Sequence, residues 1–123
     1  MEKTRILCLD DSEIALEMLE ATLSEEGFEV FTTSNWPEVN SYIFREKIKV
    51  FLCDINMPGL TGVDLCKILK ESVPDIKIIL FSSLEKGELR KLSSSCGADG
   101  WISKKDPPEL WGKKLLHCLS LQC

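Results

Sequence analysis

Short apolar runs alternate with longer amphipathic segments along this chain of 123 residues. The runs are rich in Ile, Leu, Val, Phe and Cys, a composition typical of strands that are covered on both faces. In the segments between them, apolar residues recur at helical spacing. The runs predict five strands, at 5–9, 28–32, 50–53, 76–81 and 101–103.

The segments between the runs carry signals for helix starts and ends. Ser12 is a plausible N-cap for the first helix, and Gly27 ends that helix. Thr61 and Asp64 resemble a capping box that opens the third helix, and Asp106 is expected to cap the last one. The helices are expected from Ser12 to Gly27, at 35–46, from Thr61 through Leu69, at 85–95, and from Asp106 to Leu119.

The order of these elements predicts the fold class. Strands separated by helices are typical of βαβ units, which build a parallel sheet between two helical layers. We therefore expect an α/β fold. The pattern runs through residues 1–123 without a repeat, a linker or a low-complexity tract, so a single domain is expected, with no separate output domain in this chain.

The charge of the chain argues against two classes of partner. The net charge is −5, and neither the basic footprint of a nucleic-acid-binding domain nor a polybasic patch for anionic lipid is present. No apolar run approaches the roughly 20 residues of a membrane span. The N-terminus lacks the layout of a signal peptide. We expect a cytoplasmic protein that by itself binds neither nucleic acid nor membranes.

Six cysteines raise the question of disulfides or a zinc site. No two of them have CxxC spacing, and His117 is the only histidine, so the pattern does not favour zinc. Cysteines inside apolar strands behave as small hydrophobic residues. We expect unpaired thiols at Cys8, Cys53, Cys66, Cys96, Cys118 and Cys123.

Polar residues with phosphoryl-transfer chemistry follow the predicted strands. In an open parallel sheet, ligands bind at the carboxyl ends of the strands. Carboxylates follow the first and third strands, hydroxyls follow the fourth, and ammonium groups follow the fifth. A carboxylate nucleophile, an oxygen site for magnesium, a hydroxyl and a cation are the groups that phosphoryl transfer needs. They are Asp10, Asp11, Asp54, Asn56, Ser82, Ser83, Lys104 and Lys105.

Four segments of the chain resemble the CheY-like response-regulator receiver domains of two-component signal transduction. They are Leu9-Asp10-Asp11-Ser12, Asp54-Ile55-Asn56-Met57-Pro58-Gly59-Leu60-Thr61-Gly62, Ile79-Leu80-Phe81-Ser82-Ser83 and Gly97-Ala98-Asp99-Gly100-Trp101-Ile102-Ser103-Lys104. Each is weak alone, but all four occur in order and at the ends of the expected strands. The resemblance covers about residues 4–120. It implies a flavodoxin-like three-layer (βα)5 fold with a parallel five-stranded sheet of order 2-1-3-4-5.

The resemblance also implies a phosphoacceptor and a metal site. Asp54 would accept a phosphoryl group from a histidine kinase or a histidine phosphotransfer protein. Asp11 and Asp54 would bind Mg²⁺ through their carboxylates, Asn56 through its backbone carbonyl, and Asp10 through a metal-bound water. Mg²⁺ prefers oxygen ligands and keeps several waters, which suits these residues.

The remaining matched residues would bind and sense the phosphoryl group. Ser82 would hydrogen-bond a phosphoryl oxygen, and Lys104 would pair with Asp54 before transfer and with the phosphoryl group afterwards. Trp101 fills the place of the aromatic switch residue of the family, which turns inward when the hydroxyl at Ser82 moves toward the phosphate. The protein would catalyse only its own phosphorylation and dephosphorylation at Asp54.

The family resemblance also implies an output surface, formed by the fourth helix, the fifth strand and the fifth helix. Through it, the protein would bind an unknown downstream protein, as a monomer or as a weak phosphorylation-dependent dimer. The expected surface residues are Leu89, Leu92, Trp101, Lys105 and Trp111.

Some interpretations remain open from sequence. Trp101 is either a switch or a structural tryptophan that packs on the last helix. The chain is either a phosphorylated regulator or an interaction module that keeps the acid pocket without using it. A dehalogenase-like phosphatase is disfavoured, because Asn56 stands where its second Asp belongs and no capping insertion exists. Lys105 follows Lys104 where many receivers have proline, so a trans peptide bond is expected there.

Overall fold

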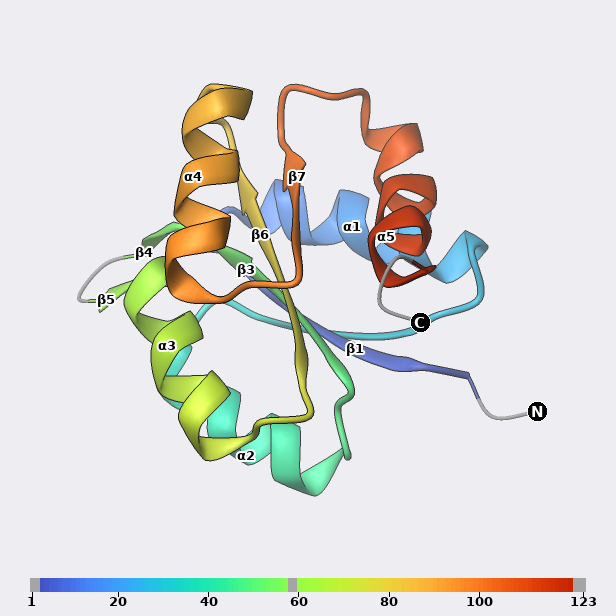
Figure 1. Cartoon of the computed structure of the whole chain (residues 1–123). Coiled ribbons are helices and arrows are strands. Elements are labelled where there is room, and N and C mark those ends of the chain that lie inside the picture. Colours follow the sequence, from blue (N-terminus) through green and yellow to red (C-terminus); the bar gives the residue numbers. More distant parts are fainter. Residues whose placement is uncertain (1–2, 58–59, 121–123) are drawn as a thin grey trace.

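The computed structural model describes residues 3–57 and 60–120, and at their centre lies a parallel sheet of five strands (Figure 1). Along the sheet the order is β2-β1-β3-β6-β7, which is 2-1-3-4-5 when these strands are numbered along the chain. This confirms the α/β flavodoxin-like fold. The strands are β1 (Arg5–Leu9), β2 (Glu29–Thr33), β3 (Val50–Asp54), β6 (Lys77–Ser82) and β7 (Gly100–Ser103).

A second, very small sheet follows the third strand and was not predicted. β4 (Asn56–Met57) pairs antiparallel with β5 (Leu60–Thr61). The breaker pair Pro58-Gly59 lies outside the described residues. Two-residue strands leave no apolar periodicity in the sequence, and so this hairpin gave no signal.

Five helices alternate with the strands of the large sheet. They are α1 (Glu13–Glu25), α2 (Val39–Arg45), α3 (Gly62–Ser72), α4 (Lys86–Cys96) and α5 (Trp111–Ser120). Two of the predicted caps are confirmed. The hydroxyl of Ser12 accepts a hydrogen bond from the amide of Ala15 at 3.2 Å, and that of Thr61 accepts one from the amide of Asp64 at 3.1 Å.

The second and last helices begin later than predicted. Short 3-10 turns at Trp36–Glu38 and Pro108–Leu110 precede them, each with proline in its first two residues. The expectation that Asp106 caps the last helix is wrong. Its carboxylate is instead bound by the ammonium groups of Lys86 and Lys114, at 3.0 and 3.2 Å.

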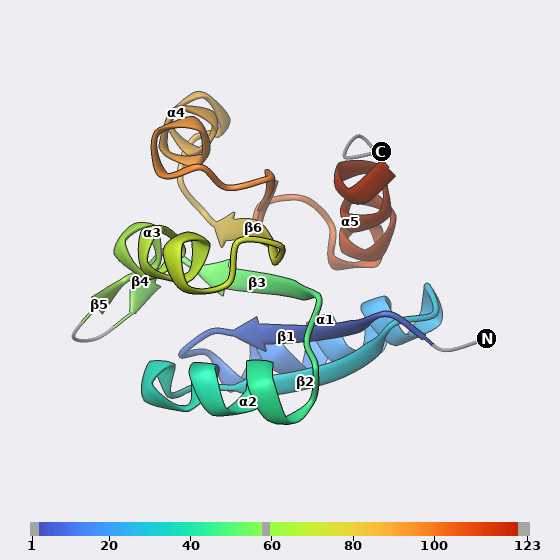
Figure 2. The same cartoon turned by 60° about the horizontal axis from the view of Figure 1, so that its bottom comes forward.

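The sheet separates two hydrophobic cores, because successive residues of a strand point to opposite faces. One core packs β-strand residues such as Leu7 and Phe51 against α2, α3 and α4. The other packs residues such as Ile6 and Leu52 against α1 and α5. Figures 1 and 2 show the same grouping of the helices on the two faces of the sheet.

Two residues expected at the output surface belong to these cores instead. The side chain of Leu89 is fully buried under α4, and Trp111 is only 3% exposed. The Trp111 ring packs edge-on against Phe81, with the ring centroids 4.9 Å apart, and its indole N–H donates to the carbonyl of Asp106 at 3.0 Å. Each residue follows an exposed residue, Glu88 or Leu110, and the sequence alone did not show which face each would take.

The cysteines within the described residues are free thiols, as predicted, and Cys123 lies outside the described part of the chain. Burial raises the pKa of Cys66 to about 12, and burial likewise raises that of Cys53 well above its ordinary value. These thiols remain protonated and pack as small hydrophobic groups. Among the described helices, none is both long and apolar enough to cross a membrane.

Candidate functional site

The register of the sheet brings the predicted polar residues to one edge. Leu9 of β1 lies beside Cys53 of β3, so that Asp10, which follows β1, and Asp54, which ends β3, lie at the same level. Ser82 of β6 pairs with Ser103 of β7, and the amide of Lys104 donates to the carbonyl of Ser82 at 2.8 Å. Strand ends far apart in the sequence thus form one site.

Three carboxylates lie at this edge close enough to share a cation. One oxygen from each of Asp10, Asp11 and Asp54 lies within 4.8 Å of the others. Asp10 is fully buried and Asp54 is 4% exposed, whereas Asp11 is exposed. An all-oxygen cluster with one open side fits Mg²⁺, which binds through a few carboxylates and keeps several waters.

Lys104 supplies the positive charge that the site itself contains. Its ammonium lies 2.8 Å from Oδ2 of Asp10 and 3.4 Å from Oδ1 of Asp54, and 5.2 Å from the centroid of the Phe81 ring. Its shorter ion pair is therefore with Asp10, although the family resemblance pointed to Asp54. Burial by itself would lower the pKa of Lys104, but hydrogen bonds and charge pairing with Asp10, and then with Asp54, raise it.

The carboxyl group of Asp54 is only partly compensated by this lysine. Burial first, and the neighbouring charge of Asp10 second, raise its pKa from 3.8 to about 6. Lys104 and the amide of Asn56, which lies 3.4 Å from Oδ1 of Asp54, act in the opposite direction. One lysine does not neutralise two buried carboxylates, and so the cluster favours an additional cation.

Ser82 is buried beside this cluster, with 1% of its surface exposed. Its Oγ accepts a hydrogen bond from the amide of Leu84 at 3.1 Å. A hydroxyl that accepts one hydrogen bond still has a proton to donate, so Ser82 retains the donor that the prediction assigned to it.

Gly62 packs directly against the backbone of Asp54 and Ile55, and sequence reasoning missed this role. A Cβ at Gly62 would collide with the carbonyl oxygen of Asp54 and would lie 2.8 Å from Cα of Ile55. The amide of Gly62 donates to the carbonyl of Ile55 at 2.7 Å. The signal was present in the sequence, as a glycine at the first position of a helix next to the Thr61 cap.

The roles predicted for Asn56 as a metal ligand and for Trp101 as a switch stay predictions. Asn56 is exposed and pairs with Thr61 in the small hairpin, so that its backbone carbonyl as a metal ligand stays a prediction. Trp101 is half-buried on β7, and its carbonyl accepts from the thiol of Cys118 at 3.8 Å. The peptide bond between Lys104 and Lys105 is trans, as predicted, and no cis bond occurs in the described residues.

Comparisons with known proteins identify the family. Residues 6–113 match the model of the response regulator receiver domain. The hydrogenase transcriptional regulatory protein HoxA of Cupriavidus necator is 37% identical over 87 residues, which are 71% of this chain but only 18% of that protein. This chain thus spans less than a fifth of the length of that relative.

Solved structures show the same fold. The chemotaxis response regulator CheY4 of Vibrio cholerae is 26% identical, with a TM-score of 0.84 over 95% of this chain and 99% of the other. The beryllofluoride-activated receiver domain dimer of NtrC4 is 25% identical, with a TM-score of 0.83 over 97% of this chain and 98% of the other. The matched model, the sheet order and the acid cluster agree, and the chain belongs to the response regulator receiver domain family.

Proposed function

We propose that this protein is a phosphoacceptor response regulator that takes a phosphoryl group onto Asp54 from a histidine kinase or a histidine phosphotransfer protein. The observation that carries the proposal is the Asp54 carboxylate at a strand end, clustered with the carboxylates of Asp10 and Asp11 and 3.4 Å from the ammonium of Lys104. The proposal treats residues 1–123 as one receiver domain with its core at about 4–120, which the family match over 6–113 supports.

The metal site follows from the same cluster. Asp11 and Asp54 would hold Mg²⁺ directly, with the carbonyl of Asn56, and Asp10 would act through water. When bound, Mg²⁺ supplies positive charge that offsets the repulsion between the carboxylate and an anionic phosphoryl donor.

Each protein group has a defined part in the transfer. An oxygen of Asp54 forms a bond to phosphorus, while the bond from phosphorus to the donor imidazole nitrogen breaks and its electron pair leaves with the imidazole. Lys104 lies 3.4 Å from Asp54 and provides a fixed positive charge for the transferred group. Ser82 donates its hydroxyl proton to a phosphoryl oxygen. The acyl phosphate is later hydrolysed to inorganic phosphate, which restores Asp54.

Receiver domains are phosphoacceptors rather than enzymes acting on other substrates, and here catalysis is proposed only for the phosphorylation and dephosphorylation of Asp54. The switch would run from Ser82 on β6 to Trp101 on β7 and so to the surface of α4, β7 and α5. Of the predicted surface residues, Leu92, Trp101 and Lys105 remain on this side, because Leu89 and Trp111 are buried.

Oligomeric state and location complete the proposal. A monomer that dimerises weakly on phosphorylation is supported by the NtrC4 receiver, whose beryllofluoride-activated form is described as a dimer. A cytoplasmic location is supported by the free thiols of the described cysteines, since reducing compartments keep thiols unpaired.

Phosphorylation with a small donor tests the proposal. The protein is incubated with acetyl phosphate and Mg²⁺, and intact mass spectrometry is expected to show the gain of one phosphoryl group. Asp54→Asn is expected to abolish the adduct, and Asp75→Asn, at an exposed acid outside the site, is expected to keep it. Absence of an adduct on the unchanged protein would contradict the proposal and favour a pure interaction module.

A further inference from the structure

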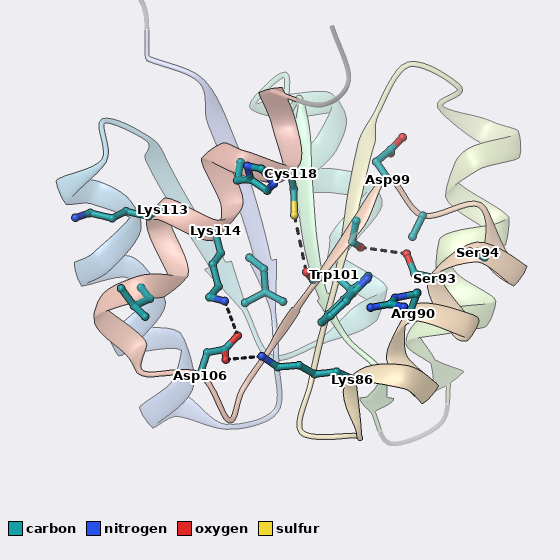
Figure 3. A pocket seen from close by; sticks show the side chains of 15 residues that line it. Lys86, Arg90, Ser93, Ser94, Asp99, Trp101, Asp106, Lys113, Lys114 and Cys118 are labelled. Atoms are coloured by element: carbon teal, nitrogen blue, oxygen red, sulfur yellow. Dashed lines mark hydrogen bonds and ion pairs between the residues drawn. The ribbon is translucent and has the colours of Figure 1, made fainter.

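A groove opens between α4 and α5, over β7, on the side of the molecule that Figure 3 shows. Its volume is about 610 Å³, and its lining is mainly apolar. Trp101 lies at its centre (Figure 3). Leu110, which is 39% exposed and ends the 3-10 turn before α5, also lines it. Tryptophan and arginine are among the residues that contribute most to binding at protein interfaces.

The rim of the groove is basic, in contrast to the acidic chain as a whole. Arg90 of α4 and Lys113 of α5 are exposed there, and within the described residues no ion pair is recorded for either. Asp99, the acid at the far end of the groove, is bound to Lys70 at 2.7 Å. The rim therefore offers two cations to a ligand while the protein carries a net charge of −5.

Two further lysines at the rim already hold a carboxylate. Lys86 from α4 and Lys114 from α5 both contact Asp106, at 3.0 and 3.2 Å (Figure 3). Burial alone would raise the pKa of Asp106, but the hydrogen bonds from the two lysines lower it. Lys86 of α4 and Lys114 of α5 thus form a carboxylate-binding site in the groove, and the side chain of Asp106 occupies it.

We propose that this groove binds an acidic amphipathic segment of a partner protein, and that Asp106 competes with the carboxylates of that segment for Lys86 and Lys114. The apolar side chains of the segment pack around Trp101, and its carboxylates pair with Arg90 and Lys113. This inference rests on the proposed use of the α4-β7-α5 surface for output, and it adds the chemistry of the partner. Charge complementarity of this kind selects partners and speeds their association.

Binding of a designed peptide tests the partner class. The probe is a fluorescein-labelled peptide with Leu and Phe on one face and Glu on the other, and the matched probe has Lys in place of Glu. Fluorescence anisotropy is expected to show binding of the acidic peptide that weakens with salt, and no binding of the basic one. Equal binding of both peptides, or binding of neither, overturns the proposal.

Charge reversal locates the binding. Arg90→Glu with Lys113→Glu is expected to weaken binding of the acidic peptide about tenfold, because it removes two attractive pairs and adds two repulsive ones. All the substituted side chains are exposed, so the fold is retained. The control, Lys47→Glu with Lys49→Glu, makes the same change in net charge outside the groove and is expected to leave binding unchanged. Equal weakening by both pairs of substitutions overturns the assignment to the groove.

A substitution at Asp106 tests whether its carboxylate competes with the peptide for Lys86 and Lys114. Asp106→Asn frees both lysines and is expected to strengthen peptide binding about two- to fivefold. Glu109→Gln removes the same charge from an exposed neighbour that does not line the groove, and is expected to have no effect. Equal effects of the two substitutions would overturn the role of Asp106.

Repeating the titration with beryllofluoride and Mg²⁺ separates this inference from the proposed function. Binding that depends on Arg90 and Lys113 but does not respond to beryllofluoride would support the groove and contradict the switch. If the acidic peptide does not bind the groove although the mass spectrum shows the phosphoryl adduct on Asp54, the inference about the groove is contradicted and the proposed function stands.

Discussion

Asp54 is a buried carboxylate held between one lysine and a second buried carboxylate. Lys104 lies closer to Asp10 than to Asp54, so the charge of Asp54 is the less well compensated of the two. Burial and the charge of Asp10 consequently raise the pKa of Asp54 to about 6. The proposed phosphoacceptor is therefore also a point of instability in the metal-free protein.

Removing the negative charge of Asp54 is expected to stabilise the metal-free fold. Because the pKa of Asp54 rises from 3.8 in the unfolded chain to about 6 in the folded one, the folded state binds the proton more tightly. Stability therefore falls as the pH rises through this window, by about 3 kcal/mol at most. Asp54→Asn is expected to raise the free energy of unfolding by about 1–3 kcal/mol at neutral pH and to change little below pH 4.

Urea denaturation in EDTA at several pH values measures this difference. Asp75→Asn serves as the control, since it removes an exposed charge elsewhere. A variant at position 54 that is no more stable than the unchanged protein at neutral pH would contradict the expectation.

At the scale of elements, the first residue of α3 packs against the last residue of β3, so that the position of each constrains the other. Gly62 opens α3 against the backbone of Asp54 and Ile55, and Thr61 caps the same helix. The helix start thereby fixes where the backbone carbonyl of Asp54, the proposed phosphoacceptor, lies. A side chain at position 62 has no space unless this backbone moves.

Gly62→Ala is expected to destabilise the fold by about 1–3 kcal/mol through overpacking. The displaced Asp54 backbone is also expected to slow phosphorylation by acetyl phosphate. Gly87→Ala is the matched control, because a Cβ there meets no atom within 4 Å. Helix propensity makes that change neutral or stabilising by up to about 1 kcal/mol. Thermal unfolding and the rate of adduct formation test both variants, and equal behaviour of the two would contradict the proposed contact.

The large elements were predictable and the short ones were not. The strand expected at 76–81 is β6 (Lys77–Ser82), because a long apolar run carries its own periodicity. The helix starts at 35 and at Asp106 were wrong, because proline-containing 3-10 turns precede α2 and α5 there. Such turns, like the β4–β5 hairpin, are shaped by packing rather than by a local pattern.

At the scale of the whole molecule, the acid cluster and the basic rim of the groove lie in different places. The acid cluster lies at one edge of the sheet, whereas the exposed cations Arg90 and Lys113 lie on the rim of the groove between α4 and α5. β6 and β7 connect the two regions, since Ser82 pairs with Ser103 and Leu80 with Trp101. A change at the acid cluster therefore has a short structural route to the groove.

Mg²⁺ is expected to stabilise the whole fold through the acid cluster. A ligand that binds only the folded state adds about 2.7 kcal/mol when its free concentration is about a hundred times its dissociation constant. Asp11→Asn is expected to remove this stabilisation and to leave the metal-free protein folded, because Asp11 is exposed and outside the ion pair of Asp10 and Lys104. Differential scanning calorimetry with and without MgCl2 gives the answer. An unchanged melting temperature in saturating Mg²⁺ would contradict the metal site.

The sequence by itself determined the alternation of strands and helices, the parallel sheet and the acids at its carboxyl edge. These follow from periodicity and from short motifs, which are local properties of the chain. Only the tertiary structure decided that Lys104 pairs most closely with Asp10, that Trp111 is buried, and that Asp106 holds two lysines from different helices. The physical reason is that burial and ion pairing depend on which distant segments meet, and no local pattern encodes that.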